Sequence, residues 1–255
     1  MTLATWYEDH GRHALPWRLT RDRWAILVSE VMLHQTQVPR VAAVYGAFLA
    51  RFPTPTAMAD AGPAAVIEAW DRLGYPRRAR RLYDSAVVVR DHGWPDDLTT
   101  LPGIGRYTAA AILAQADDVD VPAIEVNIRR VAERVSGARL SERAAEETTV
   151  RVGRPLRGRD RLLALMDVGA LLCRPREPRC RDCPLRRRCA TRGPRPDETR
   201  HRQAPFAGSF RQRRGEVMAR LRTGSAPVRE LDADALASLV DDGLAVVVRG
   251  RARLP

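Results

Sequence analysis

Apolar side chains recur along residues 1–190 with the spacing of amphipathic helices. Trp24, Leu27, Val28 and Val31 stand at positions i, i+3, i+4 and i+7, and residues 128–135 repeat the pattern. This period gives each helix one apolar face that packs against a core. Runs that alternate apolar and polar residues are nearly absent here, so the pattern predicts a mostly α-helical fold.

The pattern changes toward the end of the chain. Residues 191–209 are rich in proline, arginine and small polar residues, which is typical of a linker. Two short helical patterns follow at 213–223 and 232–241, then a β-branched run at 244–248 and a basic segment after Gly250. Helix, helix and a basic two-stranded ribbon is the order of a winged-helix module. A small cap with no role in DNA binding is the alternative.

The amino-acid composition indicates the class of binding partner. The 255 residues contain 43 Lys+Arg, all of them arginine, against 31 Asp+Glu, and the formal charge is +12. Such a charge favours a polyanionic partner, nucleic acid before anionic membrane. No apolar stretch approaches the roughly 18 residues of a membrane span, and the first residues lack a secretory signal. Because lysine is absent, no side-chain amine can form a Schiff base.

The four cysteines lie close together in the order C-x6-C-x2-C-x5-C. In a chain without a secretory signal, such a cluster indicates a metal site rather than two disulfides. Four thiolates suit tetrahedral zinc or an iron–sulfur cluster, and the ligand type alone does not separate the two. The candidate ligands are Cys173, Cys180, Cys183 and Cys189.

A glycine-containing turn opens a predicted helix in the middle of the chain. The sequence LPGIGRYT at 101–108 is followed by a run of small residues. Gly103 and Gly105 would allow positive φ and close backbone approach. The free N–H groups of the helix that follows form an anion site suited to a DNA phosphate, with Arg106 beside it. A plain interhelical turn is the alternative.

The LPGIG turn and the cysteine cluster, in this order, resemble the helix–hairpin–helix (HhH-GPD) DNA glycosylases that carry an iron–sulfur cluster. Within that superfamily the resemblance is strongest to the MutY branch, which removes adenine. It also rests on LPWR, SEVMLHQTQV, LGYPRRARRL and LPGIGRYTAAAI, which begin at residues 15, 29, 73 and 101. The resemblance implies a [4Fe–4S] cluster on the four cysteines. It further implies a cytoplasmic, nucleoid-associated bacterial monomer that acts on double-stranded DNA with a mispaired or damaged base and does not bind membranes.

The resemblance also implies a domain organisation. Residues 1–190 would form the two-lobed glycosylase domain, with a six-helix lobe at about 24–135 and an iron–sulfur lobe from 1–23 and 136–190. A linker at 191–209 and a small, winged-helix-like α+β module at 210–255 would follow. The C-terminal Nudix-like domain of the MutY branch does not fit in the residues after Cys189, so we expect it to be absent. Recognition of 8-oxoguanine then falls to the catalytic domain or the tail, or is lost.

Glu30, in SEVMLHQTQV, matches the catalytic glutamate of the family. On a helix its neighbours at i±3 and i±4 include Ile26, Leu27 and Leu33, a mostly apolar surround. Desolvation there raises the pKa of a carboxyl group and keeps a proton available for a general acid. Without the resemblance, an ordinary exposed helix glutamate would be the preferred interpretation.

The second carboxylate departs from the family pattern. The usual aspartate, two residues before Asn127, is replaced by Glu125, which is one methylene longer and a poorer N-cap. Because stabilising an oxocarbenium depends on accurate placement, this change puts the rate or the activity in question. Asn127 matches the residue that supports this carboxylate. Tyr107 stands where the strand-cleaving relatives carry lysine and matches a tyrosine that lines the sugar site.

Further matches concern the base pocket and the DNA wedge. Trp17, Arg18 and Leu33 match the adenine pocket, whereas Gln35 and Tyr75 match residues that enter the duplex where the base is flipped out. His34 replaces a usual glutamine beside the wedge and is either a tolerated change or a new base reader.

The sequence therefore predicts a monofunctional DNA N-glycosylase of base excision repair. It would hydrolyse the N-glycosidic bond of an adenine mispaired with 8-oxoguanine or guanine, with little or no AP lyase activity. Two alternatives remain open. One is a glycosylase for thymine, uracil or another modified base, and the other is a non-catalytic protein that binds damaged DNA.

Overall fold

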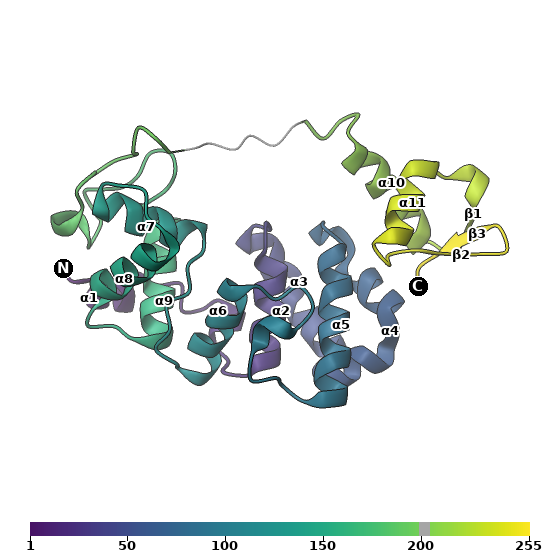
Figure 1. The fold of residues 1–255 in the computed structure, drawn as a ribbon, viewed down its shortest axis with the longest axis horizontal. Helices are drawn as coiled ribbons and strands as arrows, with labels where there is room; N and C mark the ends of the chain where they lie inside the picture. Colours follow the sequence, from purple (N-terminus) through teal and green to yellow (C-terminus); the bar gives the residue numbers. More distant parts are fainter. Residues whose placement is uncertain (199–204) are drawn as a thin grey trace. The chain divides into compact units, whose positions relative to one another are not determined.

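Residues 1–198 and 205–255 are described in the computed structural model (Figure 1). Within them the chain is mostly helical with one small sheet near the C-terminal end, as the sequence pattern predicts. The chain divides into two compact units, Met1–Glu30 with Ile104–Arg200 and Val31–Gly103 with His201–Pro255. Helix α2, Arg23–Leu33, contributes residues to both units.

The first unit packs its helices around one apolar core. The core draws on α1 and on the helices after the LPGIG turn, and its members include Trp6, Ile128, Leu162 and Leu165. These apolar positions follow the helical period, so each helix turns one face inward. The helices of this unit are α1 (Leu3–His10), α6 (Arg106–Asp117), α7 (Val126–Ser136), α8 (Glu142–Gly153) and α9 (Gly158–Asp167), with the short turns η1 (Pro16–Arg18), η4 (Val168–Leu172) and η5 (Arg186–Arg188).

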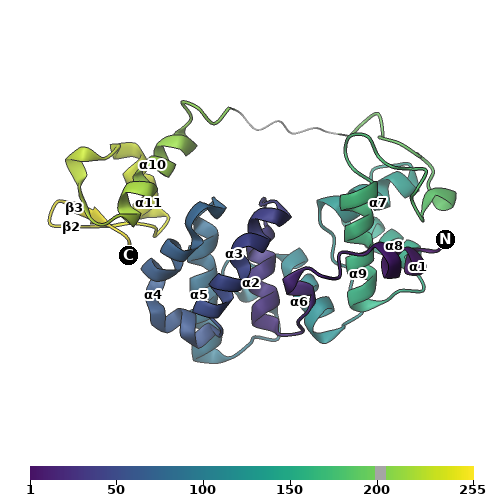
Figure 2. The same cartoon turned by 180° about the vertical axis from the view of Figure 1, so that it is seen from behind.

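The second unit contains a group of three longer helices and the C-terminal module. In Figures 1 and 2, α4 and α5 lie side by side. Helix α4 is kinked at Gly62, whose φ is 82°, directly before Pro63, because proline cannot continue a regular helix without a break. The helices of this group are α3 (Val38–Arg51), α4 (Pro55–Trp70) and α5 (Arg77–His92), with η2 (Asp71–Leu73) and η3 (Leu98–Thr100).

The C-terminal module has its own small core and sheet. Its order is α10 (Phe210–Arg222), β1 (Ala226–Pro227), η6 (Val228–Glu230), α11 (Ala233–Asp241), β2 (Val246–Val248) and β3 (Arg251–Arg253). The strands are antiparallel in the order β1-β3-β2. The predicted order of two helices and a basic ribbon is confirmed, whereas β1 is too short to leave a sequence signal. Part of the expected linker, 199–204, lies outside the described residues.

In the described parts of the chain, no helix is both long enough and apolar enough to cross a bilayer.

Candidate active site

Glu30 lies near the end of α2 and is almost completely buried, with 3% of its surface exposed. Its Oε1 accepts a hydrogen bond from Gln115 Nε2 at 2.8 Å, and the Tyr107 hydroxyl also donates to this carboxyl. Both donors belong to α6, where a spacing of eight residues puts them on one face. The helix after the glycine turn therefore holds the buried carboxyl from one side.

This surround favours the protonated form of Glu30. Burial raises the pKa of the Glu30 carboxyl, and the nearby charge of Glu125 adds to this effect, although Gln115 and Tyr107 oppose it by hydrogen bonding. Burial and the two carboxylates also hold the pKa of the Tyr107 phenol well above its ordinary value of 10.0. Glu30 thus retains its proton to higher pH than an exposed glutamate, and Tyr107 remains a neutral hydrogen-bond donor.

Glu125 caps helix α7 despite its extra methylene. Its carboxylate accepts from the backbone N–H groups of Asn127 and Ile128 at 2.8 and 2.7 Å, and from Asn127 Nδ2 at 2.8 Å. Burial raises the pKa of this carboxyl, whereas these hydrogen bonds oppose the shift because they favour the ionised form. The longer side chain therefore still reaches the cap position, and Asn127 supports it directly.

Arg18 and Trp17 are both buried in the first unit. The Arg18 guanidinium makes two hydrogen bonds to Asp167, at 2.6 and 2.8 Å, and Asp167 also pairs with Arg12 at 2.6 Å. Although burial alone would raise it, the pKa of the Asp167 carboxyl is lowered by these two arginines. Both terminal nitrogens of Arg18, Nη1 and Nη2, thus donate to Asp167. Arg18 therefore has a structural role in addition to the one expected from the sequence.

The expected wedge residues lie in the second unit on two short loops. Gln35 has φ 57° after the end of α2, and Tyr75 has φ 48° before α5. The Gln35 side chain is exposed and Tyr75 is 43% exposed. Positive φ is uncommon for residues other than glycine and marks positions that the surrounding structure must hold.

Arg78 holds both wedge loops. Its guanidinium lies over the Tyr75 and Trp70 rings, 5.5 and 5.2 Å from the centroids, and it donates to Thr36 Oγ1 at 2.9 Å. Burial lowers its pKa to about 10, so it stays charged at neutral pH, and burial also lowers the pKa of the neighbouring His34. The carbonyl groups that accept from this one guanidinium belong to Val31, Met32, His34, Leu73 and Gly74.

The two glycines of the LPGIG turn have different roles. Gly103 has φ 79°, and a Cβ there would lie 2.6 Å from Cδ of Arg81, so glycine is required. Gly105 is the N-cap of α6 with φ −93°, and a Cβ there would meet nothing. The expectation of positive φ at both glycines is therefore wrong for Gly105. Gly105 provides no side-chain cap to α6, and Arg106 beside it is largely exposed.

The four cysteines line one cavity in the first unit, together with apolar side chains that include Val131 and Leu185. Arg134 donates to Cys173 Sγ at 3.5 Å, and the backbone N–H of Arg192 donates to Cys189 Sγ at 3.4 Å. Burial raises the pKa of the Cys183 thiol to about 11. Four sulfurs around an apolar cavity with cationic neighbours fit an iron–sulfur cluster.

Within residues 1–198 and 205–255, no three His, Cys, Asp or Glu side chains are arranged as ligands of one metal ion. All four cysteines are free thiols, as expected for ligands rather than disulfides.

Three residues that contact the candidate site residues were missed from the sequence. Gln115 has a weak signal, since it shares a helix face with Tyr107. Arg78 stands in the matched segment LGYPRRARRL, but nothing in that segment identifies its acceptors on another loop. Asp167 is paired with Arg18, 149 positions away. Helical periodicity predicts the side of its helix on which Asp167 lies, but not that Arg18 is its partner.

Residues 28–155 match the model of the HhH-GPD superfamily base excision DNA repair proteins, and the chain belongs to this family. More particularly, it is similar to the adenine DNA glycosylase of Mycolicibacterium smegmatis, with 40% identity over 95% of this chain and 90% of the relative. The human adenine DNA glycosylase is 36% identical over 75% of this chain and 39% of its own length. The resemblance inferred from the sequence is thus confirmed.

Solved structures agree with this assignment. A thermostable thymine-DNA glycosylase superposes with a TM-score of 0.68 and 27% identity, over 74% of this chain and 93% of that chain. A trapped endonuclease III–DNA intermediate superposes with a TM-score of 0.63, over 74% and 92% of the two chains. At 21% identity the second likeness concerns the fold alone.

Proposed function

We propose that this chain is an adenine DNA glycosylase of base excision repair, which hydrolyses the N-glycosidic bond of a mispaired adenine in double-stranded DNA. The observation that carries the proposal is the buried Glu30 carboxyl, held by Tyr107 and Gln115. A purine leaves readily only when a ring nitrogen is protonated, and a buried carboxyl that keeps its proton is suited to that step. The similarity to adenine DNA glycosylases supports the same assignment.

In the first step, the Glu30 carboxyl donates its proton to a ring nitrogen of the adenine. The bond between the sugar C1′ and the base nitrogen then breaks, and its electron pair leaves with the neutral base. The sugar becomes an oxocarbenium ion, and Glu30 is left as a carboxylate. Hydrogen bonds from Tyr107 and Gln115 stabilise the carboxylate that forms.

In the second step, water replaces the base. The Glu125 carboxylate, fixed by two backbone N–H groups and by Asn127, stabilises the positive charge on the sugar. The Glu30 carboxylate accepts a proton from water as the oxygen bonds to C1′, which restores the acid. The product is an abasic site in an unbroken strand.

Strand cleavage is not expected to follow. A bifunctional glycosylase needs an amine that forms a Schiff base with the sugar, and this sequence contains no lysine. Tyr107 stands at the corresponding position, and its buried phenol cannot form such an adduct.

The cysteine cavity is proposed to hold a [4Fe–4S] cluster on Cys173, Cys180, Cys183 and Cys189. When bound, the cluster supplies cross-links among chain segments and a local charge, and no step of base removal is routed through it. Arg134, which donates to Cys173, would then help to offset the charge of the thiolates.

DNA contacts are proposed for both units. In the second unit, Gln35 and Tyr75 would replace the stacking lost when adenine leaves the helix, with His34 beside them. Leu33 would contact the adenine itself. In the first unit, Trp17 and Arg18 support the base pocket, and the N-terminus of α6, with Gly105 and Arg106, binds a phosphate. Gly103, the last residue of the second unit before the boundary, supplies the positive φ of the turn. We also propose that residues 1–190 form the glycosylase domain, 191–209 a linker and 210–255 the small C-terminal module.

Removal of thymine is a second candidate, because one structural neighbour is a thymine-DNA glycosylase. The test is single-turnover base release from duplexes carrying A:8-oxoguanine, A:G, T:G and U:G, each analysed with and without alkali. We expect cleavage only after alkali and only in the adenine duplexes. Release from T:G or U:G alone would move the assignment to pyrimidines. Binding without release from any duplex would leave a non-catalytic DNA-binding protein.

A further inference from the structure

The C-terminal module has the topology of a winged helix. The order α10, β1, η6, α11, β2, β3, with β3 between β1 and β2, is that of helix, strand, turn, helix and wing. In helix-turn-helix proteins the helix at the place of α11 enters the major groove. The distribution of charge over the module indicates which of its faces is suited to DNA.

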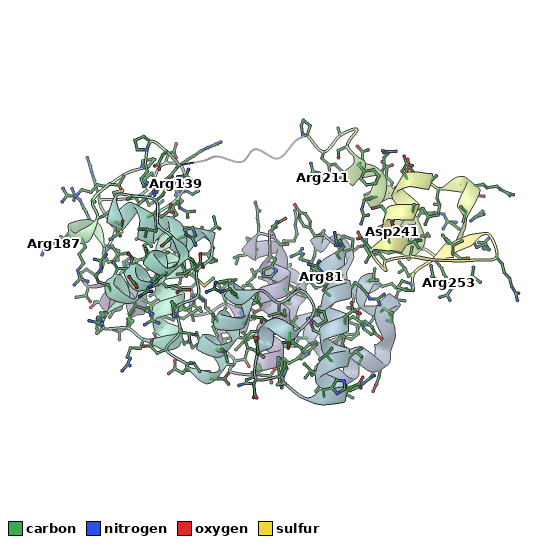
Figure 3. The ribbon with its side chains drawn as sticks, viewed as in Figure 1. Arg81, Arg139, Arg187, Arg211, Asp241 and Arg253 are labelled. Atoms are coloured by element: carbon green, nitrogen blue, oxygen red, sulfur yellow. The ribbon has the colours of Figure 1, made fainter. Side chains whose placement is uncertain are left out.

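Helix α11 is unsuited to DNA. It presents the exposed carboxylates of Asp234 and Asp241, which a phosphate backbone would repel. On α10, Arg213 and Arg214 are already ion-paired with the carboxylates at the two ends of α11, at 3.0 and 2.6 Å. The usual recognition face is therefore acidic or neutralised. Figure 3 marks Asp241 on this helix.

The β2–β3 hairpin has the opposite character. Val247 and Val248 are about half exposed, and Arg249, Arg251 and Arg253 are all exposed. No acidic residue occurs in 243–255. The tip is a two-residue turn with positive φ at Arg249 and Gly250, which makes the hairpin tight and its register fixed. Exposed valines between guanidinium groups suit contact with the sugars and phosphates of a DNA groove.

The hairpin is held by the second unit rather than tethered loosely. Arg80 donates to the carbonyl of Gly243 at 2.9 Å, and Arg77 pairs with Asp242 at 3.3 Å. Both arginines lie in the first turn of α5, directly after the loop of Tyr75. The hairpin therefore belongs to the same compact unit as the proposed wedge residues.

We propose that the β2–β3 hairpin, residues 246–253, binds duplex DNA at a second site, away from the damaged base and without preference for lesion or sequence. This inference rests on the proposed function only in taking duplex DNA as the partner. It is tested by binding to undamaged duplex, whereas the proposed function is tested by base release, so each can fail separately.

The test compares three variants of the full chain in binding a 30-base-pair undamaged duplex at several salt concentrations. The first is R249Q/R251Q/R253Q. The second, R143Q/R151Q/R157Q, removes the same charge from the exposed surface of α8 and the start of α9. The third, D234N/D241N, removes the exposed carboxylates of α11. Melting curves establish that each variant is folded.

We expect the hairpin variant to bind more weakly by about tenfold or more at low salt, with a salt slope reduced by about 2 to 3, because each lost phosphate contact contributes about 0.9. The other two variants should change affinity by about threefold at most. Equal losses in both arginine variants, or a large gain in D234N/D241N, would overturn the inference.

A measurement on the unaltered chain covers the case in which the hairpin variant does not fold. Hydrogen exchange of residues 246–253 is followed with and without the undamaged duplex. Slower exchange of the hairpin amides on adding DNA supports the contact, and unchanged exchange at saturating DNA excludes it.

Discussion

A carboxyl group that must donate a proton near neutral pH has to be kept from water, and Glu30 meets this requirement at a cost in stability. The unfolded chain releases the proton near pH 4.5, whereas burial raises the pKa in the folded chain. The stability contributed by this group is therefore complete below about pH 4.5 and is lost as pH rises through the raised pKa. The same burial supports the proposed chemistry, so stability and activity oppose each other at this residue.

Replacing Glu30 with glutamine separates these two effects. We expect E30Q to lower single-turnover adenine release by at least about 100-fold, the typical contribution of a general acid. It should also raise the melting temperature at pH 8 by about 2–4 °C, the shift that 1 kcal/mol produces in a chain of this size. The gain should shrink as pH falls and vanish below pH 4.5, where both states hold the proton.

The wild-type rate should in turn fall as pH rises through the raised pKa of Glu30, since the acid form is then lost. Kinetics and melting curves across pH check both points. Unchanged base release in E30Q would remove Glu30 from the mechanism.

At the scale of elements, two features place groups that periodicity alone cannot place. The N-terminus of α7 binds Glu125, and the guanidinium of Arg78 joins the loop after α2 to the loop before α5. In both cases a single side chain satisfies backbone groups that would otherwise be left without partners. Helix and loop ends therefore position Glu125 and the proposed wedge residues, whereas Glu30 is held by one face of α6.

Three variants of Glu125 distinguish its role as a helix cap from its charge. E125A should lose about 1 kcal/mol of stability with the cap, and base release with it. E125D restores the family residue and should retain both. E125Q keeps the length without the charge, so we expect slower base release, by about tenfold or more, with a smaller loss of stability. Equal rates for E125Q and wild type would show that the charge is not needed.

Arg78 is a positioning residue, and its loss should disturb both wedge loops. We expect R78M to reduce base release at saturating enzyme by about tenfold or more, because misplaced groups slow a reaction strongly. It should also weaken base flipping, seen as a smaller fluorescence change from 2-aminopurine in the duplex. R78K keeps the positive charge but lacks the planar guanidinium with its several N–H donors. It should therefore restore base release and base flipping only in part. R90A, an exposed position on the same helix, is the control, and normal flipping in R78M would contradict the role.

At the scale of the whole molecule, the cysteine cavity joins chain segments that are distant in sequence. Arg134 of α7 lines it with residues that follow α9, and Arg134 also pairs with Glu198 at 2.6 Å. The four thiols must lose their protons to bind metal, and the segments that carry them are brought together only in the folded chain. Metal loading and folding of the first unit should therefore be coupled.

Replacing Cys183 with serine tests this coupling. The purified wild-type chain should be brown, absorb near 400 nm, and contain about four irons per chain. C183S should lose most of the iron and melt at a lower temperature, because a ligand that binds only the folded state stabilises it. Iron analysis and melting curves provide the readouts. A colourless wild-type chain with bound zinc would contradict the assignment of the cluster.

The sequence predicted the helices and the order of the C-terminal module because each leaves a local signal. Glu30, Tyr107 and Glu125 stand in short motifs, and Cys173 and its partners lie within one segment. The sequence did not predict the contacts of Asp167 or Arg78, whose partners lie on other elements. Periodicity specifies which face of an element is buried, but the partner depends on packing between elements.

The β2–β3 hairpin has a consequence for solubility. Among residues 1–198 and 205–255, strand β2 has a neighbour on one side only. Its three valines have the high β-propensity of segments that add a strand from a second chain. The arginines at and after the tip oppose such pairing through the repulsion of like charges between copies. Salt screens this repulsion, so concentrated protein should self-associate through this edge at high ionic strength while its helices remain folded. Short duplex DNA that covers the hairpin should keep the chains apart.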